Sequence, residues 1–540
     1  MNRSFVGYVM KIVLVRIDPL IGSEYHSGGG AIYNLKAYLL GQKDLANRLS
    51  VDLFAFDSLQ KGDANIKVAQ IYEKKPQLVG FSCYCWNMDN VLRYSMLLKK
   101  LQPDVIVVVG GPEVSFNSEE ILAKNPQIDI IVRGEGEVTF GELVRMLVEK
   151  SKSDLRFVEG ISFRKGDKVV KNPDRPLLKE LDNIPSPFIE GIVDLTCTSG
   201  EVTIETARGC PFHCNYCLYH KNMLGIRSYS WKRIESELKF LCKSKSVTLI
   251  SFADPTFNYD EKRALRILEI IKKYNRKVGL SLELRAELLT DELIEQLGHL
   301  NIVELAFGLQ TISSSTNLNL NRVFIRERFQ QNIQKIVRKM QGKDVRIDVD
   351  LIYGLPGDDV NEYKRSVDFV ISLGAHIYYQ PLRVFDGTAI REVTDKHSIL
   401  FDPLPPHNVL GTTTFSWRDM IESYKVNAGL DYYQNSPGIK KILDRIRIFL
   451  DLTPADICQK VGHYFWVNEL HRNFRLCNFT PDDRPSKQFL NDFFCFASFL
   501  MKTEKKLAQL RTELLEMVKD MRDDREGTKS ESLGYYKFAI

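Results

Sequence analysis

The sequence predicts an α/β protein with two successive stretches of alternating strands and helices, followed by a helical region. Two observations point to this fold class. Short apolar runs recur from residue 10 to residue 392, and segments with helical spacing separate them. One run, Val105 to Val109, is almost pure valine, as expected of a strand buried on both faces. Strands that alternate with helices form parallel sheets, so we expect two of them.

The length and composition bound the class of protein. A chain of 540 residues has room for three or four domains, and 44% hydrophobic residues is a globular value. The net charge of +5 is small for this length and does not by itself indicate nucleic acid or a membrane surface. No signal peptide is recognisable, and no run approaches the ~20 apolar residues that span a bilayer. We therefore expect no nucleic-acid partner and no membrane span.

The first stretch, residues 10–150, contains five expected strands: Lys11–Ile17, Val51–Phe56, Leu78–Cys83, Val105–Val109 and Ile128–Val132. Ligands of parallel sheets bind beyond the carboxyl ends of the strands. Three notable segments lie there. Ser82 to Asn87 follows the third strand, Gly110-Gly111-Pro112-Glu113 the fourth, and Gly134-Glu135-Gly136-Glu137 the fifth. Glycines at strand ends let a large flat ligand approach backbone amides, although each motif alone is also explained by a tight turn.

A connecting region is expected at residues 151–200. Gly160 to Val170 reads as a β-hairpin with Gly166 in the turn, and four prolines up to Pro187 mark an extended crossing segment. We therefore interpret residues 151–200 as a linker with a hairpin between two domains.

The second stretch, residues 201–392, again alternates strands with helices, and its six expected strands are Glu201–Thr206, Val247–Phe252, Lys277–Leu282, Ile302–Phe307, Arg346–Ile352 and Ala375–Val384. Residues 393–540 carry no motif that we can assign, but they are rich in aromatic residues. We expect a mainly helical C-terminal domain that packs on the second domain, and the functional alternative is that it shapes the substrate pocket.

Three cysteines follow the first strand of the second stretch. Cys210, Cys214 and Cys217 have CxxxCxxC spacing, which leaves one iron of a four-iron cluster without a protein ligand. The alternatives are a zinc loop or three unrelated thiols, and His213 is a further candidate ligand. Zinc sites usually show a second pair of ligands, which this sequence lacks. We predict a redox cluster on the three thiols, and hence a reducing, cytoplasmic location.

The cysteine loop resembles that of the radical S-adenosylmethionine (radical SAM) enzymes, with Tyr216 as its aromatic residue, and the resemblance implies that Tyr216 contacts SAM. The resemblance implies a [4Fe-4S] cluster whose open iron binds S-adenosylmethionine. It also implies an electron donor, such as flavodoxin or ferredoxin, and cleavage of SAM to methionine and a 5′-deoxyadenosyl radical that abstracts a hydrogen atom.

The GGPE and GEGE motifs resemble the cobalamin-binding domain that precedes many radical SAM domains. No DxHxxG motif is present, so the resemblance implies cobalamin held without a histidine ligand. Trp86 is a candidate for excluding a sixth cobalt ligand, and ordinary packing is its alternative. Cys83 and Cys85 are better explained as small buried residues. The implied cobalamin contacts are Ser82, Trp86, Asn87, Gly110, Gly111, Pro112, Glu113, Gly134, Glu135 and Gly136.

The second stretch resembles the partial (β/α)6 barrel of radical SAM enzymes. The resemblance implies that Asp254 contacts the SAM amino group and that Glu283 contacts the ribose hydroxyls. It further implies that Arg285 meets the SAM carboxylate. Tyr353 lies in a segment, Leu351 to Gly357, that resembles the adenine-binding motif. Gln310 stands where relatives often have a glutamate, two residues after a glycine. Because this residue departs from the family pattern, we assign it no SAM contact.

The resemblance gives the following domains: 10–150, a Rossmann-like, doubly wound cobalamin-binding domain; 151–200, the linker; 201–392, the radical SAM partial barrel; and 393–540, the helical domain. It implies a cobalamin-dependent radical SAM methyltransferase that methylates an unactivated carbon of a peptide or natural product from methylcobalamin. A cyclase or ring-rearranging enzyme and a non-catalytic cobalamin or redox sensor are the alternatives. Methylthio transfer would need further cysteine ligands.

Overall fold

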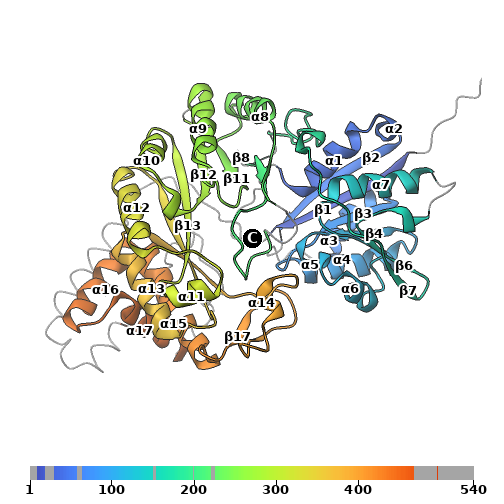
Figure 1. Ribbon diagram of the computed structural model, residues 1–540. Coiled ribbons are helices and arrows are strands. Elements are labelled where there is room, and N and C mark those ends of the chain that lie inside the picture. Colours follow the sequence, from blue (N-terminus) through green and yellow to red (C-terminus); the bar gives the residue numbers. More distant parts are fainter. Residues whose placement is uncertain are drawn as a thin grey trace, which may run out of the picture.

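The computed structural model describes residues 9–18, 29–57, 64–149, 154–196, 198, 200–219, 225–275, 277–467 and 496. Figure 1 shows two α/β domains side by side, the first in blue to teal and the second in green to yellow. The long orange helices at the lower left, which belong to the C-terminal region, pack against the second domain, away from the first. The predicted fold class, a Rossmann-like domain followed by a partial barrel and a helical region, is confirmed.

The first domain is built on a seven-stranded sheet of order β2-β1-β3-β4-β5-β6-β7. Its five parallel strands are β1 (Met10–Asp18), β2 (Leu49–Asp57), β3 (Leu78–Ser82), β4 (Ile106–Gly110) and β5 (Ile130–Val132). The hairpin strands β6 (Ile161–Lys165) and β7 (Lys168–Lys171) continue the sheet in antiparallel orientation. The hairpin that we placed in a linker therefore belongs to the first domain, because β6 covers the edge of β5.

Helices cover both faces of this sheet, and alternate residues of β1 face opposite cores. Ile12 and Leu14 pack with helices α1 and α7, whereas Val13 and Val15 pack with α3, α4 and α6. The helices are α1 (Ala31–Gly41), α2 (Lys43–Ala46), α3 (Ala64–Glu73), α4 (Met88–Leu101), α5 (Pro112–Ser115), α6 (Ser118–Lys124) and α7 (Gly136–Glu149). Two 3-10 turns, η1 (Leu155–Phe157) and η2 (Leu181–Asn183), flank the hairpin.

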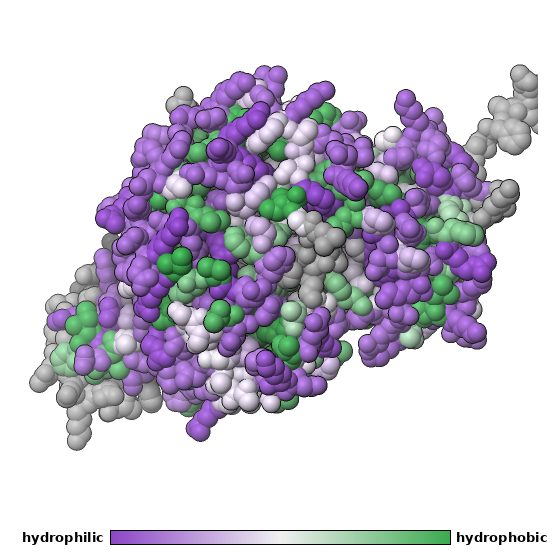
Figure 2. Space-filling model, in the orientation of Figure 1, coloured by the Kyte–Doolittle hydropathy of each residue, from purple (hydrophilic) through white to green (hydrophobic). Residues whose placement is uncertain are grey.

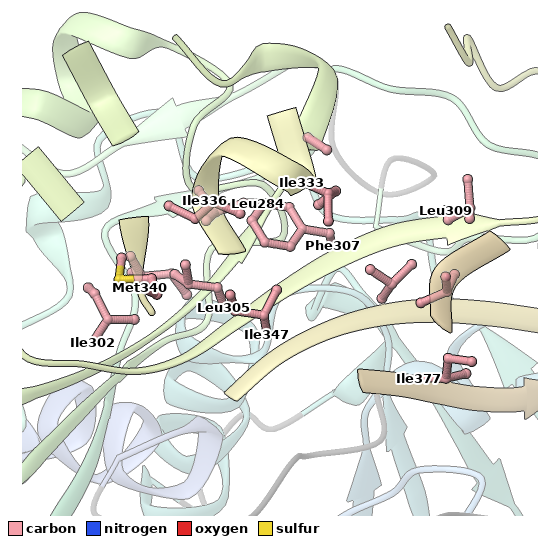
Figure 3. Close-up of a cluster of buried hydrophobic side chains, with 14 of the residues drawn as sticks. Leu284, Ile302, Leu305, Phe307, Leu309, Ile333, Ile336, Met340, Ile347 and Ile377 are labelled. Carbon is pink, nitrogen blue, oxygen red and sulfur yellow. The ribbon is translucent and has the colours of Figure 1, made fainter. Parts of the chain in front are cut away.

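The second domain is built on six parallel strands in the order β15-β14-β13-β12-β11-β8. They are β8 (Glu201–Ile204), β11 (Leu249–Phe252), β12 (Gly279–Leu284), β13 (Ile302–Gln310), β14 (Arg346–Tyr353) and β15 (His376–Pro381). Strands β8 and β15 are the two edges, so the sheet is open, as a partial barrel requires. Figure 3 shows how side chains of β12 to β15, such as Leu284, Phe307 and Ile377, and of α12, such as Ile336, form the buried core.

Helices follow the strands of the second domain and carry its outer layer. They are α8 (Trp231–Lys243), α9 (Glu261–Asn275), α10 (Asp291–Gly298), α11 (Ser314–Asn319), α12 (Arg326–Lys339) and α13 (Val360–Ser372), with the 3-10 turn η3 (Ala286–Leu288). A two-stranded hairpin, β9 (Ala207–Arg208) and β10 (Arg227–Ser228), brackets the cysteine loop. The loop therefore starts and ends at one fixed place beside β8.

The C-terminal region begins with short elements, α14 (Ala389–Glu392), β16 (Leu400–Phe401) and β17 (Val409–Gly411), and continues with α15 (Trp417–Asn435), α16 (Pro437–Phe449) and α17 (Pro454–Val467). Its helices share the core of the second domain, through residues such as Met420 and Phe465. The predicted helical character is confirmed as far as residue 467, and residues 468–495 and 497–540 lie outside the described residues.

Hydrophilic side chains predominate on the face shown in Figure 2, with hydrophobic ones scattered among them. Among the described residues, every helix is too short or too polar to cross a lipid bilayer.

Candidate functional site

The two α/β domains enclose a cavity of about 640 Å³. Residues that follow the strands of both sheets line it, so the carboxyl ends of the two sheets face each other across it. The segment after β15 and His407 from the C-terminal region form a third wall. The cavity therefore brings together the strand-end motifs of the first domain and the cysteine loop.

All three predicted cluster ligands, Cys210, Cys214 and Cys217, line the cavity. Burial raises the pKa of the Cys217 thiol to about 12 and also raises that of Cys210. Iron is bound by thiolates, so the metal itself must displace these protons. Among the described residues, no three histidine, cysteine or acidic side chains converge as the ligands of a single metal ion would.

Asp254 anchors the entry to the cysteine loop. Its carboxylate accepts hydrogen bonds from the backbone amides of Thr206, at 2.8 Å, and Ala207, at 3.3 Å. It also accepts from the Thr206 hydroxyl and pairs with Arg263 at 2.8 Å. Asp254 is 1% exposed and does not line the cavity. The start of the loop occupies both oxygens, so the structure keeps this side chain out of the cavity, and its contact with the SAM amino group stays a prediction.

Tyr353, for which the sequence predicts a SAM contact, also lies outside the cavity lining, and this contact stays a prediction. It ends β14, and its ring packs against Tyr363 and Tyr424 in the core of the second domain. Its neighbour Ile352 lines the cavity, whereas Tyr353 does not. Successive side chains of a strand point to opposite faces, which puts the motif's tyrosine on the side away from the cavity.

The remaining predicted SAM contacts, Tyr216, Glu283 and Arg285, do line the cavity. The Arg285 guanidinium lies 3.9 Å from the centre of the Phe212 ring and donates to the Val323 carbonyl. Burial lowers the pKa of Arg285, and the charge of Arg322 lowers it further. A bound carboxylate would relieve both effects, so this arginine fits the carboxylate of SAM.

Arg322 is a cavity residue that the sequence did not single out. Its Nη1 lies 3.9 Å from the Cys214 sulfur, and its Nη2 donates to the Gly308 carbonyl. It comes from the segment after α11, which has no strand-end motif, so only the tertiary structure brings it to the cluster loop. Gln310, to which we assign no SAM contact, also lines the cavity.

One part of the first-domain wall, at the ends of β3, β4 and β5, presents backbone and small side chains. Ser82, Gly110, Gly111, Pro112, Gly134 and Gly136 line it as predicted. Gly111 has a φ of +122°, and a Cβ there would overlap the Cys83 carbonyl oxygen. Gly134 has a φ of +70°, and the space that its Cβ would enter is open. The Ser82 hydroxyl is buried without a hydrogen-bond partner among the described residues.

Trp86 and Asn87 have different roles in the loop after β3. Trp86 lines the cavity, stacks on Tyr84 with 4.3 Å between the ring centres, and donates to the Ile17 carbonyl at 3.2 Å. Asn87 does not line the cavity. Its amide donates to the carbonyls of Ile17 and Ser82, at 3.0 and 3.1 Å. The Asn87 side chain therefore stabilises the loop from within, and its cobalamin contact stays a prediction.

The cavity continues into the first domain as an apolar groove between the sheet and helices α1 and α7. Its lining residues include Leu14, Ile32, Leu35, Gly80, Val108, Val132 and Phe140. Such a groove suits a flat, uncharged ring system.

Both glutamates of the GEGE motif form ion pairs with the second domain. Arg208 pairs with Glu137 at 2.6 Å, with Glu205 at 2.9 Å and with Glu135 at 3.3 Å. Arg227 pairs with Glu135 at 2.6 Å. Although burial raises it, the pKa of Glu135 is held below its usual value by Arg227 and Arg208. We call these five residues, Glu135, Glu137, Glu205, Arg208 and Arg227, the interdomain ion cluster. Because Arg208 and Arg227 are paired in the β9–β10 hairpin, the interdomain ion cluster connects the GEGE loop to the base of the cysteine loop.

The glutamate of the GGPE motif makes a second link. Glu113 accepts a hydrogen bond at 2.8 Å from Nε2 of His407, a residue of the C-terminal region. Both side chains line the cavity. Glu113 and Glu135 are thus cavity residues as predicted, but each is already paired with a residue outside the first domain.

Comparison with known proteins agrees with this division of the chain. The B12 binding domain model matches residues 47–144, and the radical SAM superfamily model matches residues 204–370. A family described as a protein of unknown function (DUF4080) matches residues 395–478.

Two curated relatives and one solved structure illustrate the similarity. The cobalamin-dependent radical SAM methyltransferase TokK of Streptomyces tokunonensis is 26% identical over 324 residues, which cover 58% of this chain and 47% of TokK. An anaerobic magnesium-protoporphyrin IX monomethyl ester cyclase of Rubrivivax gelatinosus is 25% identical over 397 residues, 70% of each chain. The cobalamin-dependent S-adenosylmethionine radical enzyme OxsB superposes with a TM-score of 0.61 at 15% identity, over 97% of this chain and 85% of OxsB.

These matches define a radical SAM enzyme with a preceding cobalamin-binding domain. The chain belongs to the cobalamin-dependent radical SAM enzymes. It spans about half the length of TokK and of the carbapenam methyltransferase that it also matches, with 47% and 49% covered.

The residues present fit the three cofactors of this family: a [4Fe-4S] cluster, SAM and cobalamin. Three thiols on one short loop face the cavity, and they are suitable ligands for a cluster with one open iron. The open space at Gly134, the buried Ser82 hydroxyl without a partner and the apolar groove fit a large flat cofactor on the first domain.

Proposed function

We propose that this enzyme is a cobalamin-dependent radical SAM C-methyltransferase that methylates an unactivated carbon of a peptide or natural product. The observation that carries the proposal is the single cavity that both motif sets line. Methyl transfer to an unactivated carbon requires the same substrate atom to meet the hydrogen-abstracting group and the methyl donor. A shared cavity meets that requirement, whereas two separate pockets would not.

When bound, the cluster and SAM supply a hydrogen-abstracting radical and cobalamin supplies the methyl group. The chain holds, orients and shields these groups. Cys210, Cys214 and Cys217 bind the cluster. Glu283 accepts hydrogen bonds from the SAM ribose, and the guanidinium of Arg285, with Arg322 beside it, pairs with the SAM carboxylate. The third wall covers part of the cavity and so reduces the access of water to the reacting groups.

A second candidate is a cyclase or ring-rearranging reaction without methyl transfer. The alignment with the Rubrivivax gelatinosus cyclase favours it, because it covers 70% of both chains, more of each than the alignment with TokK does. A non-catalytic sensor is less favoured, since all three cysteines face the cavity. In either enzymatic case, we propose a cytoplasmic protein that takes electrons from a flavodoxin or a ferredoxin.

The test is anaerobic reconstitution with iron, sulfide and hydroxocobalamin, followed by SAM and a reductant. Mass spectrometry then measures 5′-deoxyadenosine and S-adenosylhomocysteine. We expect both products, with 5′-deoxyadenosine lost in Cys214→Ala. 5′-Deoxyadenosine alone, from protein that has bound cobalamin, would favour the cyclase alternative. Protein that binds neither the cluster nor cobalamin would contradict both.

A further inference from the structure

The third wall of the cavity contains an arginine that no cofactor motif accounts for. Arg383 lies two residues beyond β15 and lines the cavity together with Gln380, Phe385 and His407. It faces the loop after β3, where its Nη1 lies 4.0 Å from the Cys85 sulfur. A neutral thiol at that distance does not compensate a guanidinium charge.

The other charged groups of this wall are already paired. Asp386 accepts a hydrogen bond from Asn117 at 2.6 Å and pairs with Arg391 at 3.0 Å. His407 is hydrogen-bonded to Glu113. In the described part of the chain, no carboxylate pairs with Arg383, and its buried Nε has no hydrogen-bond partner. Arg383 as a whole is partly buried, and its Nε is shielded from water without a partner, so an anionic ligand in the cavity would stabilise the guanidinium.

The anion required here is not supplied by SAM. SAM has one carboxylate, and Arg285 and Arg322 already lie on the cluster side of the cavity, where Arg322 contacts Cys214. Arg383 lines the cavity beside the first-domain loop that carries Cys85 and Trp86. It therefore faces the space between the two cofactor-binding walls.

We propose that Arg383 binds a carboxylate or phosphate group of the substrate, so that the enzyme acts on an anionic peptide or small molecule. A guanidinium offers a carboxylate or a phosphate two parallel hydrogen bonds, which fixes the orientation of the ligand as well as its position. The inference rests on the proposed function, which requires a substrate in this cavity. It names the chemical class of that substrate.

The test measures binding and needs no turnover, so it is independent of whether methyl transfer occurs. Protein loaded with cluster and cobalamin is titrated calorimetrically with benzoate, phenyl phosphate and the neutral analogue benzamide. We expect at least one of the two anions to bind about tenfold more tightly than benzamide, or better. Arg383→Met should abolish the preference, and Arg383→Lys should keep part of it. Arg365→Met, which removes an exposed arginine of α13, is the matched control and should bind as the parent does.

Equal binding of the anions and benzamide, no binding of either anion, or an unchanged preference in Arg383→Met would overturn the proposal. A second arm compares cobalamin with cobinamide, which lacks the nucleotide and its phosphate. If Arg383→Met weakens binding of cobalamin but not of cobinamide, the anion is the phosphate of the cofactor, and the substrate assignment is wrong. A melting temperature near that of the parent shows that Arg383→Met is folded. If Arg383→Met is not folded, the anion preference of Arg383→Lys tests the proposal instead.

Discussion

The two cofactor-binding walls of the cavity are built in different ways. The first-domain wall presents glycines, a serine hydroxyl and an apolar groove, and its three cavity-lining glutamates, Glu113, Glu135 and Glu137, are paired with other parts of the chain. The second-domain wall presents thiols, arginines and Glu283. The difference shows that one wall recognises its ligand by shape and backbone, and the other by charge and coordination. The interdomain ion cluster fixes the two walls relative to each other.

The largest expected effect on activity comes from a change in the second-domain wall, which carries the cluster ligands. Cys214→Ala should reduce 5′-deoxyadenosine formation to background, because the cluster loses one of its three ligands, while cobalamin binding is unchanged. Cys242→Ala is the matched control, since this buried thiol belongs to α8 and the hydrophobic core. It should retain iron and activity and lose only about 1 kcal/mol of stability. Loss of cobalamin from the Cys214 variant would show that the two walls are not independent.

The next effect concerns the link between the walls. In Arg208→Met, three carboxylates lose the arginine that pairs with all of them. Removing one partner of a buried ion pair costs about 3–5 kcal/mol. We expect a loss of that size in urea unfolding, together with a lower iron content. Arg365→Met, which removes an exposed pair with Glu362, should cost at most about 1 kcal/mol. Similar losses in the two variants would mean that the interdomain ion cluster does not hold the domains together.

A comparison of two glycine substitutions tests the first-domain wall. Gly134→Ala places a methyl group in the open space of the cavity and should weaken cobalamin binding about tenfold. Gly166→Ala is the control, because Gly166, in the turn of the β6–β7 hairpin, also has a positive φ, +58°. An added Cβ there would likewise enter open space. Both variants should lose about 1–2 kcal/mol of stability through backbone strain. Spectroscopic titration with cobalamin measures the affinity of each variant, and only Gly134→Ala should bind it more weakly. Equal cobalamin affinities of the two variants would refute the cobalamin role of Gly134.

The smallest effect is a pH dependence at the third wall. Burial lowers the pKa of His407, but the hydrogen bond and the charge of Glu113, with the backbone and Asp386, outweigh burial and raise it above its usual value. A raised pKa in the folded state stabilises the protein below about pH 6.5, and this stability is lost as the pH rises through the folded-state pKa. His407→Gln should therefore flatten the stability profile above pH 6.5 in urea titrations. A profile that stays as steep as that of the parent would exclude His407 as its source.

The sequence predicted the strands, the order of the domains and the cysteine loop, because hydrophobic periodicity and motif spacing are local properties. It predicted less well which side chains line the cavity. Asp254 and Tyr353 occupy the expected strand ends but point away from the cavity, and the direction of a side chain at a strand end depends on register. Asn87 sits within the right loop, yet its amide bonds are internal to that loop.

The residues that the sequence missed share one property. Arg322 and His407 lie away from the strand ends and reach the cavity only because segments distant in sequence fold against it, whereas Arg383 follows β15 but belongs to no motif. The same holds for the pairing of the GEGE glutamates with Arg208 and Arg227, which joins the two domains. No local pattern marks such contacts, so only the tertiary structure reveals them.

The central claim is that cobalamin and the cluster share one cavity, and electron paramagnetic resonance tests it most directly. Cob(II)alamin and the reduced cluster are both paramagnetic, so each accelerates the spin relaxation of the other when they lie close together. The account predicts faster relaxation of the cob(II)alamin signal when the cluster is reduced, and loss of this effect in Cys214→Ala. A cob(II)alamin signal that is unaffected by the reduced cluster in the parent protein would contradict it.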